Sequence, residues 1–148
     1  MVERATLTCL WIGSFVLAML VVELYIGKTV SIDGLDMLVL LQEDRLDAMK
    51  PLFTIYGSYL AGILAFWYAK PFKPAKSDGA ERFRFWLAMA CAAVFNGWIL
   101  YMVSRAHFTT GATVMADILS AVQIASWMSV IVAPANAFYF GIKAKPAT

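Results

Sequence analysis

Long apolar segments constrain the fold of this chain more than any other feature of its sequence. A transmembrane helix needs about 20 apolar residues, because the hydrocarbon layer is roughly 30 Å thick and each helical residue rises about 1.5 Å. Segments that meet this requirement lie at residues 7–26, 51–69, 83–104 and 116–142. The sequence therefore predicts a single all-α membrane domain, a bundle of four transmembrane helices that occupies most of the 148 residues.

The composition agrees with this interpretation and excludes several classes of protein. Hydrophobic residues make up 61% of the chain and charged residues only 15%, which is too apolar for a water-soluble domain. The net charge of +2 argues against a nucleic-acid partner. The first apolar segment is longer than the core of a signal peptide and has no small-residue cleavage site after it, so we expect it to be a retained span.

The distribution of lysine and arginine predicts an orientation. With the N-terminus in the cytoplasm, eight of the twelve basic residues lie inside with three acidic residues, and four lie outside with seven. The resulting +5 inside and −3 outside follow the positive-inside rule. Aromatic residues at 66–68, 83–86 and 138–140 fall at the same inner boundary. We therefore expect a bacterial inner (plasma) membrane protein with both termini in the cytoplasm.

The two connections between the first three spans carry different charges. Apolar residues near helical spacing predict an outer amphipathic helix at about 34–49, with Asp33 as its N-cap and Pro51 as the first residue of the next helix. This helix would lie on the membrane, cap the bundle or dock a protein. The inner loop 70–82 is basic and either sets the topology or contacts anionic lipid or an acidic cytosolic partner. Together with Arg84, its cations form the predicted cytosolic basic surface: Lys70, Lys73, Lys76, Arg82 and Arg84.

Small residues at four-residue spacing predict where the helices pack. Helices in lipid associate through close approach of their backbones, and small residues allow that approach. The fourth span carries the longest such ridge and the second span a shorter one, whereas the first span has few small residues and is expected to face lipid. The predicted packing or oligomer face consists of Gly57, Ala61, Ala65, Ala121, Ala125, Ser129, Ala133, Ala137 and Gly141.

Polar residues within the spans fall at one depth. Counted from the span ends at about 1.5 Å per residue, Ser58, Tyr59, Asn96 and Gln123 can form one layer. This layer is either a set of hydrogen bonds between helices or the lining of a pore or cavity. Three-residue spacing also places Asp117, Ser120, Gln123 and Ser126 along one stripe of the fourth span, as a pore lining requires.

Charged residues gather near the predicted outer rim, at Glu23, Arg105, His107 and Asp117. Ionisable residues within a membrane are functional candidates, but close to the interface they are also tolerated as ion pairs. We expect a structural pair between Glu23 and Arg105 or between Arg105 and Asp117. The single histidine could respond to pH.

No motif for catalysis, metal binding or cofactor binding is recognisable in the sequence. The expectation is a non-catalytic membrane protein without cofactor or metal, whose partners are membrane lipid, copies of itself and other protein subunits. It would act as an oligomeric subunit or scaffold of a membrane complex. The alternative is an oligomeric pore or ion-conducting effector or sensor, such as a membrane-disrupting defence protein, lined by the fourth span.

Overall fold

Four helices and one β-hairpin make up the described part of the chain. The computed structural model describes residues 2–68, 79–105 and 113–140. In chain order the elements are α1 (Val2–Tyr25), β1 (Thr29–Ile32), β2 (Leu35–Leu38), α2 (Arg45–Tyr68), α3 (Gly79–Ser104) and α4 (Val114–Phe140). A helix lies over most of each of the four predicted segments, so the predicted helical fold class is confirmed.

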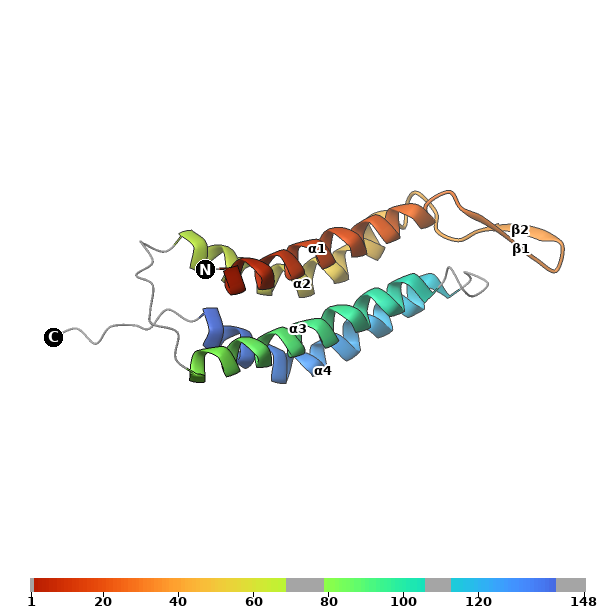
Figure 1. Ribbon diagram of the computed structural model, residues 1–148. Helices are drawn as coiled ribbons and strands as arrows, with labels where there is room; N and C mark the ends of the chain where they lie inside the picture. The colour runs from red at the N-terminus through yellow and green to blue at the C-terminus, as the bar shows by residue number, and fades with distance from the viewer. Residues whose placement is uncertain (1, 69–78, 106–112, 141–148) are drawn as a thin grey trace.

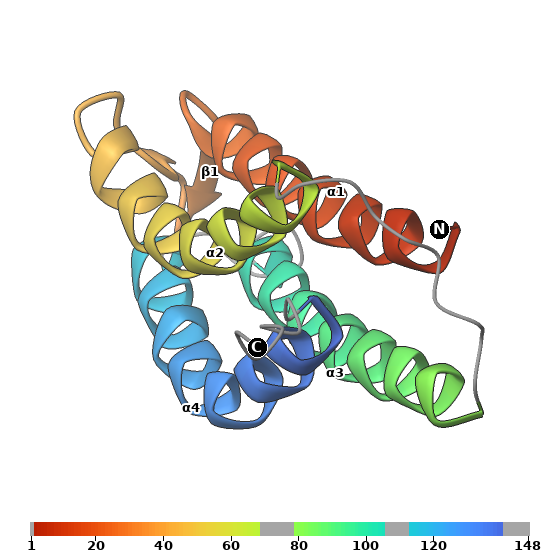
Figure 2. The same cartoon turned by 90° about the vertical axis from the view of Figure 1, so that its left-hand side faces the viewer.

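The helices lie side by side and alternate in direction (Figure 1). Helix α1 contacts α2 and α3, and α4 contacts the same two helices, so the order around the bundle is α1, α2, α4, α3 (Figure 2). The hairpin projects beyond the end of the bundle at which α1 ends and α2 begins (Figure 1). We refer to this end as the hairpin end and to the other as the opposite end.

Three of the helices are long and apolar enough to cross a membrane among the residues that the structure describes. The spans run over Val2–Tyr25, Arg82–Ser104 and Val114–Ala137. Helix α2 is not among them, because Thr54, Ser58 and three tyrosines lower its hydropathy and three charged residues lie in its first six positions. The arrangement is consistent with a membrane protein.

Residues 29–38 form a β-hairpin where the sequence analysis predicted the start of an amphipathic helix. β1 pairs antiparallel with β2 in a register that opposes Ile32 to Leu35, which leaves Asp33 and Gly34 as a two-residue turn. Both turn residues have positive φ, 54° at Asp33 and 81° at Gly34, as a type I′ turn requires. The prediction was therefore wrong for residues 34–44, and Asp33 is a turn residue rather than a helix cap.

Helix α2 begins six residues earlier than its predicted span. The amide of Ala48 donates to the carbonyl of Asp44 over 2.9 Å, which makes Asp44 the residue that caps the helix. The predicted role of Pro51 as the first residue of this helix is therefore wrong. Pro51 lies inside α2, where its missing N–H leaves the carbonyl of Asp47 without its helical donor.

The core of the bundle depends on α1 more than the sequence analysis expected. One face of α1 is buried, and its residues follow at intervals of three and four: Leu7, Trp11, Ser14, Ala18, Val22 and Tyr25. The hydroxyl of Tyr25 donates to the carbonyl of Val103 over 2.9 Å, which supplies a donor to the last turn of α3. The helix is therefore not peripheral, contrary to the expectation, although its other faces expose apolar side chains such as Leu17 and Leu20.

Large apolar side chains are exposed on the outward faces of all four helices. Examples are Leu20 on α1 (54% exposed), Phe53 on α2 (62%), Val94 on α3 (63%) and Val130 on α4 (75%). Soluble proteins rarely expose so much contiguous apolar surface. The outer surface of the bundle is therefore suited to contact with lipid.

Candidate functional site

The indole of Trp11 lies where side chains from all four helices meet. Trp11 is fully buried and stacks on the ring of Tyr59 with centroids 4.4 Å apart. Tyr56 approaches it edge-on at 6.2 Å, and the centroid of Phe95 lies at 5.4 Å. With Asn136 of α4 these residues form what we call the central cluster. Each aromatic pair contributes about 0.5–1.5 kcal/mol beyond burial, so the cluster fixes the helices relative to one another.

A buried hydrogen bond completes the central cluster. The indole N–H of Trp11 donates to Oδ1 of Asn136 over 3.2 Å, and Nδ2 of Asn136 donates to the carbonyl of Val132 over 2.9 Å. An unpaired polar group is costly in an apolar interior, so this bond favours one arrangement of α1 and α4. The sequence analysis did not single out Trp11, although its place on a three- and four-residue repeat in α1 indicates a packing face.

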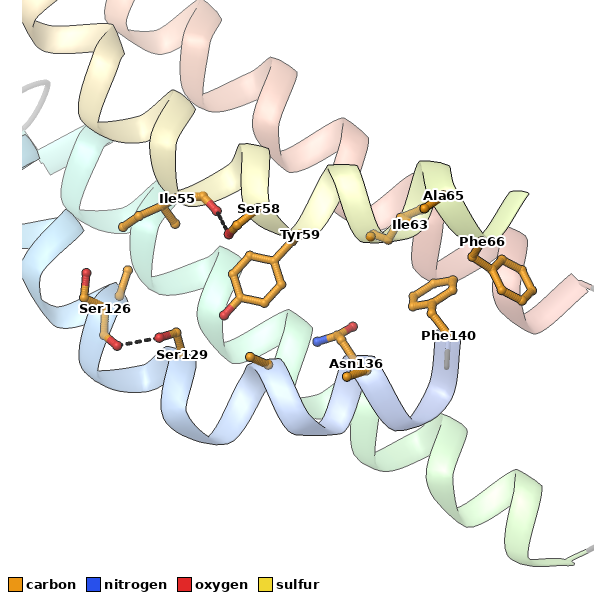
Figure 3. Close-up of a pocket in the computed structure, with 14 residues that line it drawn as sticks. Ile55, Ser58, Tyr59, Ile63, Ala65, Phe66, Ser126, Ser129, Asn136 and Phe140 are labelled. Carbon is orange, nitrogen blue, oxygen red and sulfur yellow. Dashed lines mark hydrogen bonds between the residues drawn. The ribbon is translucent and has the colours of Figure 1, made fainter. Parts of the chain in front are cut away.

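A groove of about 620 Å³ opens between α2 and α4 beside the central cluster (Figure 3). We call it the α2–α4 groove. Its lining residues on α2 are Ile55, Ser58, Tyr59, Gly62, Ile63, Ala65 and Phe66, and those on α4 are Ala125, Ser126, Ser129, Ala133, Asn136, Ala137 and Phe140. A Cβ atom added at Gly62 would meet nothing within 4 Å, so the space there is open.

Three serine hydroxyls of the α2–α4 groove already donate to their own helices. Ser58 donates to the carbonyl of Ile55 over 2.9 Å, and Ser126 donates to that of Val122 over 3.0 Å. Ser129 donates to the carbonyl of Ser126. Their oxygens retain the capacity to accept a hydrogen bond. The groove is therefore suited to hold an apolar group, with a few acceptors for a donor on that group.

The structure brings together only part of the predicted polar layer. Ser58 and Tyr59 line the α2–α4 groove, whereas Asn96 is buried and does not line it, with its Nδ2 bonded to the carbonyl of Ala92 over 2.7 Å. Gln123 is exposed and does not line the groove. These four side chains therefore do not form one continuous layer within a single chain.

The residues predicted to form one stripe on α4 also do not lie together in the groove. Ser120, Gln123 and Ser126 are exposed, but only Ser126 lines the groove. Asp117 lies at the start of the helix and accepts a hydrogen bond from the hydroxyl of Thr113 over 3.1 Å. Asp117 thus contributes to the helix N-terminus, where a carboxylate is favourable.

The predicted small-residue face is partly packed and partly open. Ala121 and Ala125 are fully buried, and Gly57 and Ser129 are half-buried. Ala61, Ala65, Ala133 and Ala137 are exposed, and all of these except Ala61 line the groove. Gly141 lies outside the described residues. The ridge on α4 therefore packs within the bundle near the hairpin end and is open toward the opposite end.

The predicted charged cluster separates into two ion pairs at the hairpin end. Arg105 lies 3.7 Å from Asp117, as one of the two expected pairings requires. Glu23 pairs with Arg45 and not with Arg105, because α2 begins early enough to bring Arg45 beside the end of α1. His107 lies outside the described residues. One pair thus joins α1 to α2, and the other joins the end of α3 to α4.

Aromatic and basic residues meet at the opposite end of the bundle. The guanidinium of Arg4 lies 4.9 Å from the ring centroid of Phe66 and 5.5 Å from that of Tyr139. Phe66 also contacts Phe140, with centroids 5.4 Å apart. Arg82 and Arg84 of the predicted basic surface are exposed there, and Lys70, Lys73 and Lys76 lie outside the described residues.

Within residues 2–68, 79–105 and 113–140, no group of three or more His, Cys, Asp and Glu side chains could hold a metal ion. Comparison with known proteins finds no matching family model, curated protein or solved structure.

Proposed function

We propose that this chain is a non-catalytic, multi-pass membrane protein that acts as a subunit or scaffold of a membrane complex. It assembles with copies of itself or with partner proteins through the α2–α4 groove. The observation that carries the proposal is this open groove, which small residues line on both helices.

The proposal takes α2 as a fourth span. From Pro51 to Tyr68 this helix has 18 residues and no charge, enough for about 27 Å of rise. It packs against α1 and α4 along the bundle, and its outward side chains Phe53, Leu64 and Trp67 are exposed. An apolar outer surface between two apolar helices supports a position within the same membrane.

The proposal also keeps the predicted orientation, with both termini in the cytoplasm of a bacterial cell and the hairpin outside. The aromatic contacts around Arg4, Phe66 and Tyr139 support an interface at the opposite end, because amphipathic aromatic side chains favour the headgroup level. Exposed Arg82 and Arg84 at this end would receive an acidic cytosolic partner.

An open groove lined by small residues favours packing of another helix in lipid. Helices associate there mainly through van der Waals packing, which small residues improve by letting backbones approach. Gly62 and Ala65 on one wall, with Ala133 and Ala137 on the other, leave room for a helix of a second copy. Filling the groove replaces loose contact with lipid chains by close packing.

A substitution that fills the groove tests the proposal. Ala137→Leu adds bulk inside the groove, and Val130→Leu adds bulk on the exposed outer face of the same helix. In lipid nanodiscs, native mass spectrometry should find oligomers for the wild type and for Val130→Leu, and monomers for Ala137→Leu. A wild type that is monomeric and co-purifies with no other protein would contradict the proposal.

One observation favours the pore as a second candidate function. Ser120 and Gln123 are exposed on α4, where polar groups facing lipid are costly, so a water-filled path between copies would accommodate them. Reconstituted liposomes should then leak ions, and Gln123→Leu should abolish the leak. Tight wild-type liposomes would exclude this candidate and leave the scaffold proposal intact.

A further inference from the structure

A second groove lies between α1 and α2, near the hairpin end. Its volume is about 760 Å³, and we call it the α1–α2 groove. The lining residues on α1 are Phe15, Val16, Met19, Leu20 and Glu23, and those on α2 are Leu46, Met49, Lys50, Phe53 and Thr54. It shares no residue with the α2–α4 groove.

The length of this groove matches one leaflet of a bilayer. Phe15 and Glu23 are eight residues apart on α1, a rise of about 12 Å. Half of a hydrocarbon layer about 30 Å thick is roughly 15 Å. Apolar side chains form the walls, and they include the exposed Val16, Leu20 and Phe53. The groove therefore has the dimensions and surface to hold the upper part of an acyl chain within one leaflet.

Two charged residues line the groove, Glu23 at the end nearest the hairpin and Lys50 midway along the α2 wall. Lys50 is exposed, and its ammonium forms no ion pair with any residue that the structure describes. Glu23 pairs with Arg45, but the two side chains remain 36% and 43% exposed. The groove thus presents an available cation and, nearer the hairpin, a carboxylate that solvent can still reach.

This pairing of charges matches the headgroup of one lipid class. A phospholipid with an amine in its headgroup carries a phosphate, which Lys50 would bind, and an ammonium, which Glu23 would bind. A purely anionic headgroup fits less well, because Glu43, Asp44 and Asp47 precede Lys50 in the chain and repel negative charge. The two charged residues and the apolar walls thus complement the two parts of a single molecule.

We propose that the α1–α2 groove binds one zwitterionic phospholipid of the phosphatidylethanolamine type. Its acyl chain lies between Phe15 and Phe53, its phosphate lies at Lys50, and its amine lies at Glu23. The lipid fills the space between α1 and α2 at this end, so it acts as a fixed component of the protein. This site does not depend on assembly through the α2–α4 groove.

A pair of tryptophan variants on α1 tests the site. Leu20→Trp places bulk in the groove, whereas Leu17→Trp places the same bulk on an exposed position of α1 that does not line it. Each purified protein is titrated with phosphatidylethanolamine or phosphatidylglycerol of identical acyl chains, and bound lipid is counted by native mass spectrometry. One phosphatidylethanolamine should bind wild type and Leu17→Trp, and none should be retained by Leu20→Trp.

Headgroup recognition is tested by removing the cation. Lys50→Ala should weaken phosphatidylethanolamine binding about tenfold, the loss of one charge-assisted hydrogen bond. Lys50→Arg keeps the cation and its hydrogen-bond donors and should retain binding. Equal lipid occupancy in Leu20→Trp and Leu17→Trp, or tighter binding of phosphatidylglycerol than of phosphatidylethanolamine, would overturn the proposal.

Discussion

Trp11 and Asn136 are 125 residues apart in the chain, and their side chains share a buried hydrogen bond of 3.2 Å. This bond joins α1 to α4, two helices that are not neighbours in the order around the bundle. The aromatic rings around this bond come from α2 and α3, so the contacts of Trp11 involve all four helices. The geometry of both walls of the α2–α4 groove depends on it, because Tyr59 and Asn136 line that groove.

Replacing Asn136 by leucine should destabilise the bundle. The variant leaves the buried indole N–H of Trp11 without an acceptor, which should lower the free energy of unfolding by about 1–2 kcal/mol. Unfolding by increasing fractions of SDS in mixed micelles measures this change. A double-mutant cycle with Trp11→Phe should return a coupling energy of about 0.6–1.7 kcal/mol. Additive effects of the two substitutions would show that the bond contributes nothing.

Asn96→Leu is a matched control, for which we expect little or no loss of stability. It is also a buried asparagine, but its Nδ2 bonds within its own helix, and its Oδ1 has no partner among the described residues. Asn96→Leu removes an unsatisfied buried acceptor, so the free energy of unfolding should change by less than about 0.5 kcal/mol or should increase. The same SDS titration measures it. A loss as large as that of Asn136→Leu would mean that Asn96 has a partner of its own.

Gly34 should be required for the hairpin. Its φ of 81° lies in the left-handed region, where a side chain costs about 1–2 kcal/mol. Gly34→Ala should therefore speed hydrogen exchange of the Val39 amide, which donates to the carbonyl of Lys28 over 2.8 Å, by about tenfold. Gly13→Ala in α1 meets open space and should leave that exchange unchanged. Unaltered exchange in Gly34→Ala would contradict the turn.

The positions of the helices could be predicted from the sequence, because hydropathy summed over about 20 residues does not depend on packing detail. The hairpin was missed although Asp33 and Gly34 are a strong turn signal between apolar segments. Residues 35–49 also carry apolar residues near helical spacing, and that longer pattern was given more weight. The early start of α2, with Asp44 at its N-cap position, is not revealed by apolar periodicity.

The candidate site was harder to predict, for geometric reasons. Counting residues gives the depth of a side chain in a membrane, but not the direction in which it points around its helix. Asn96 and Gln123 were assigned a common depth, yet Asn96 is buried and Gln123 is exposed. Trp11 was overlooked because packing was sought at small residues, whereas α1 packs through a large aromatic ring that three other helices surround.

The most direct test of the account is the side of the membrane on which each connection lies. Alkaline phosphatase and green fluorescent protein report opposite sides when fused after Gly34, after Ser77 and after Thr110. We expect the fusions after Gly34 and Thr110 to give phosphatase activity, and the fusion after Ser77 to give fluorescence. If the fusions after Gly34 and Ser77 report the same side, α2 does not cross the membrane and the four-span account is wrong.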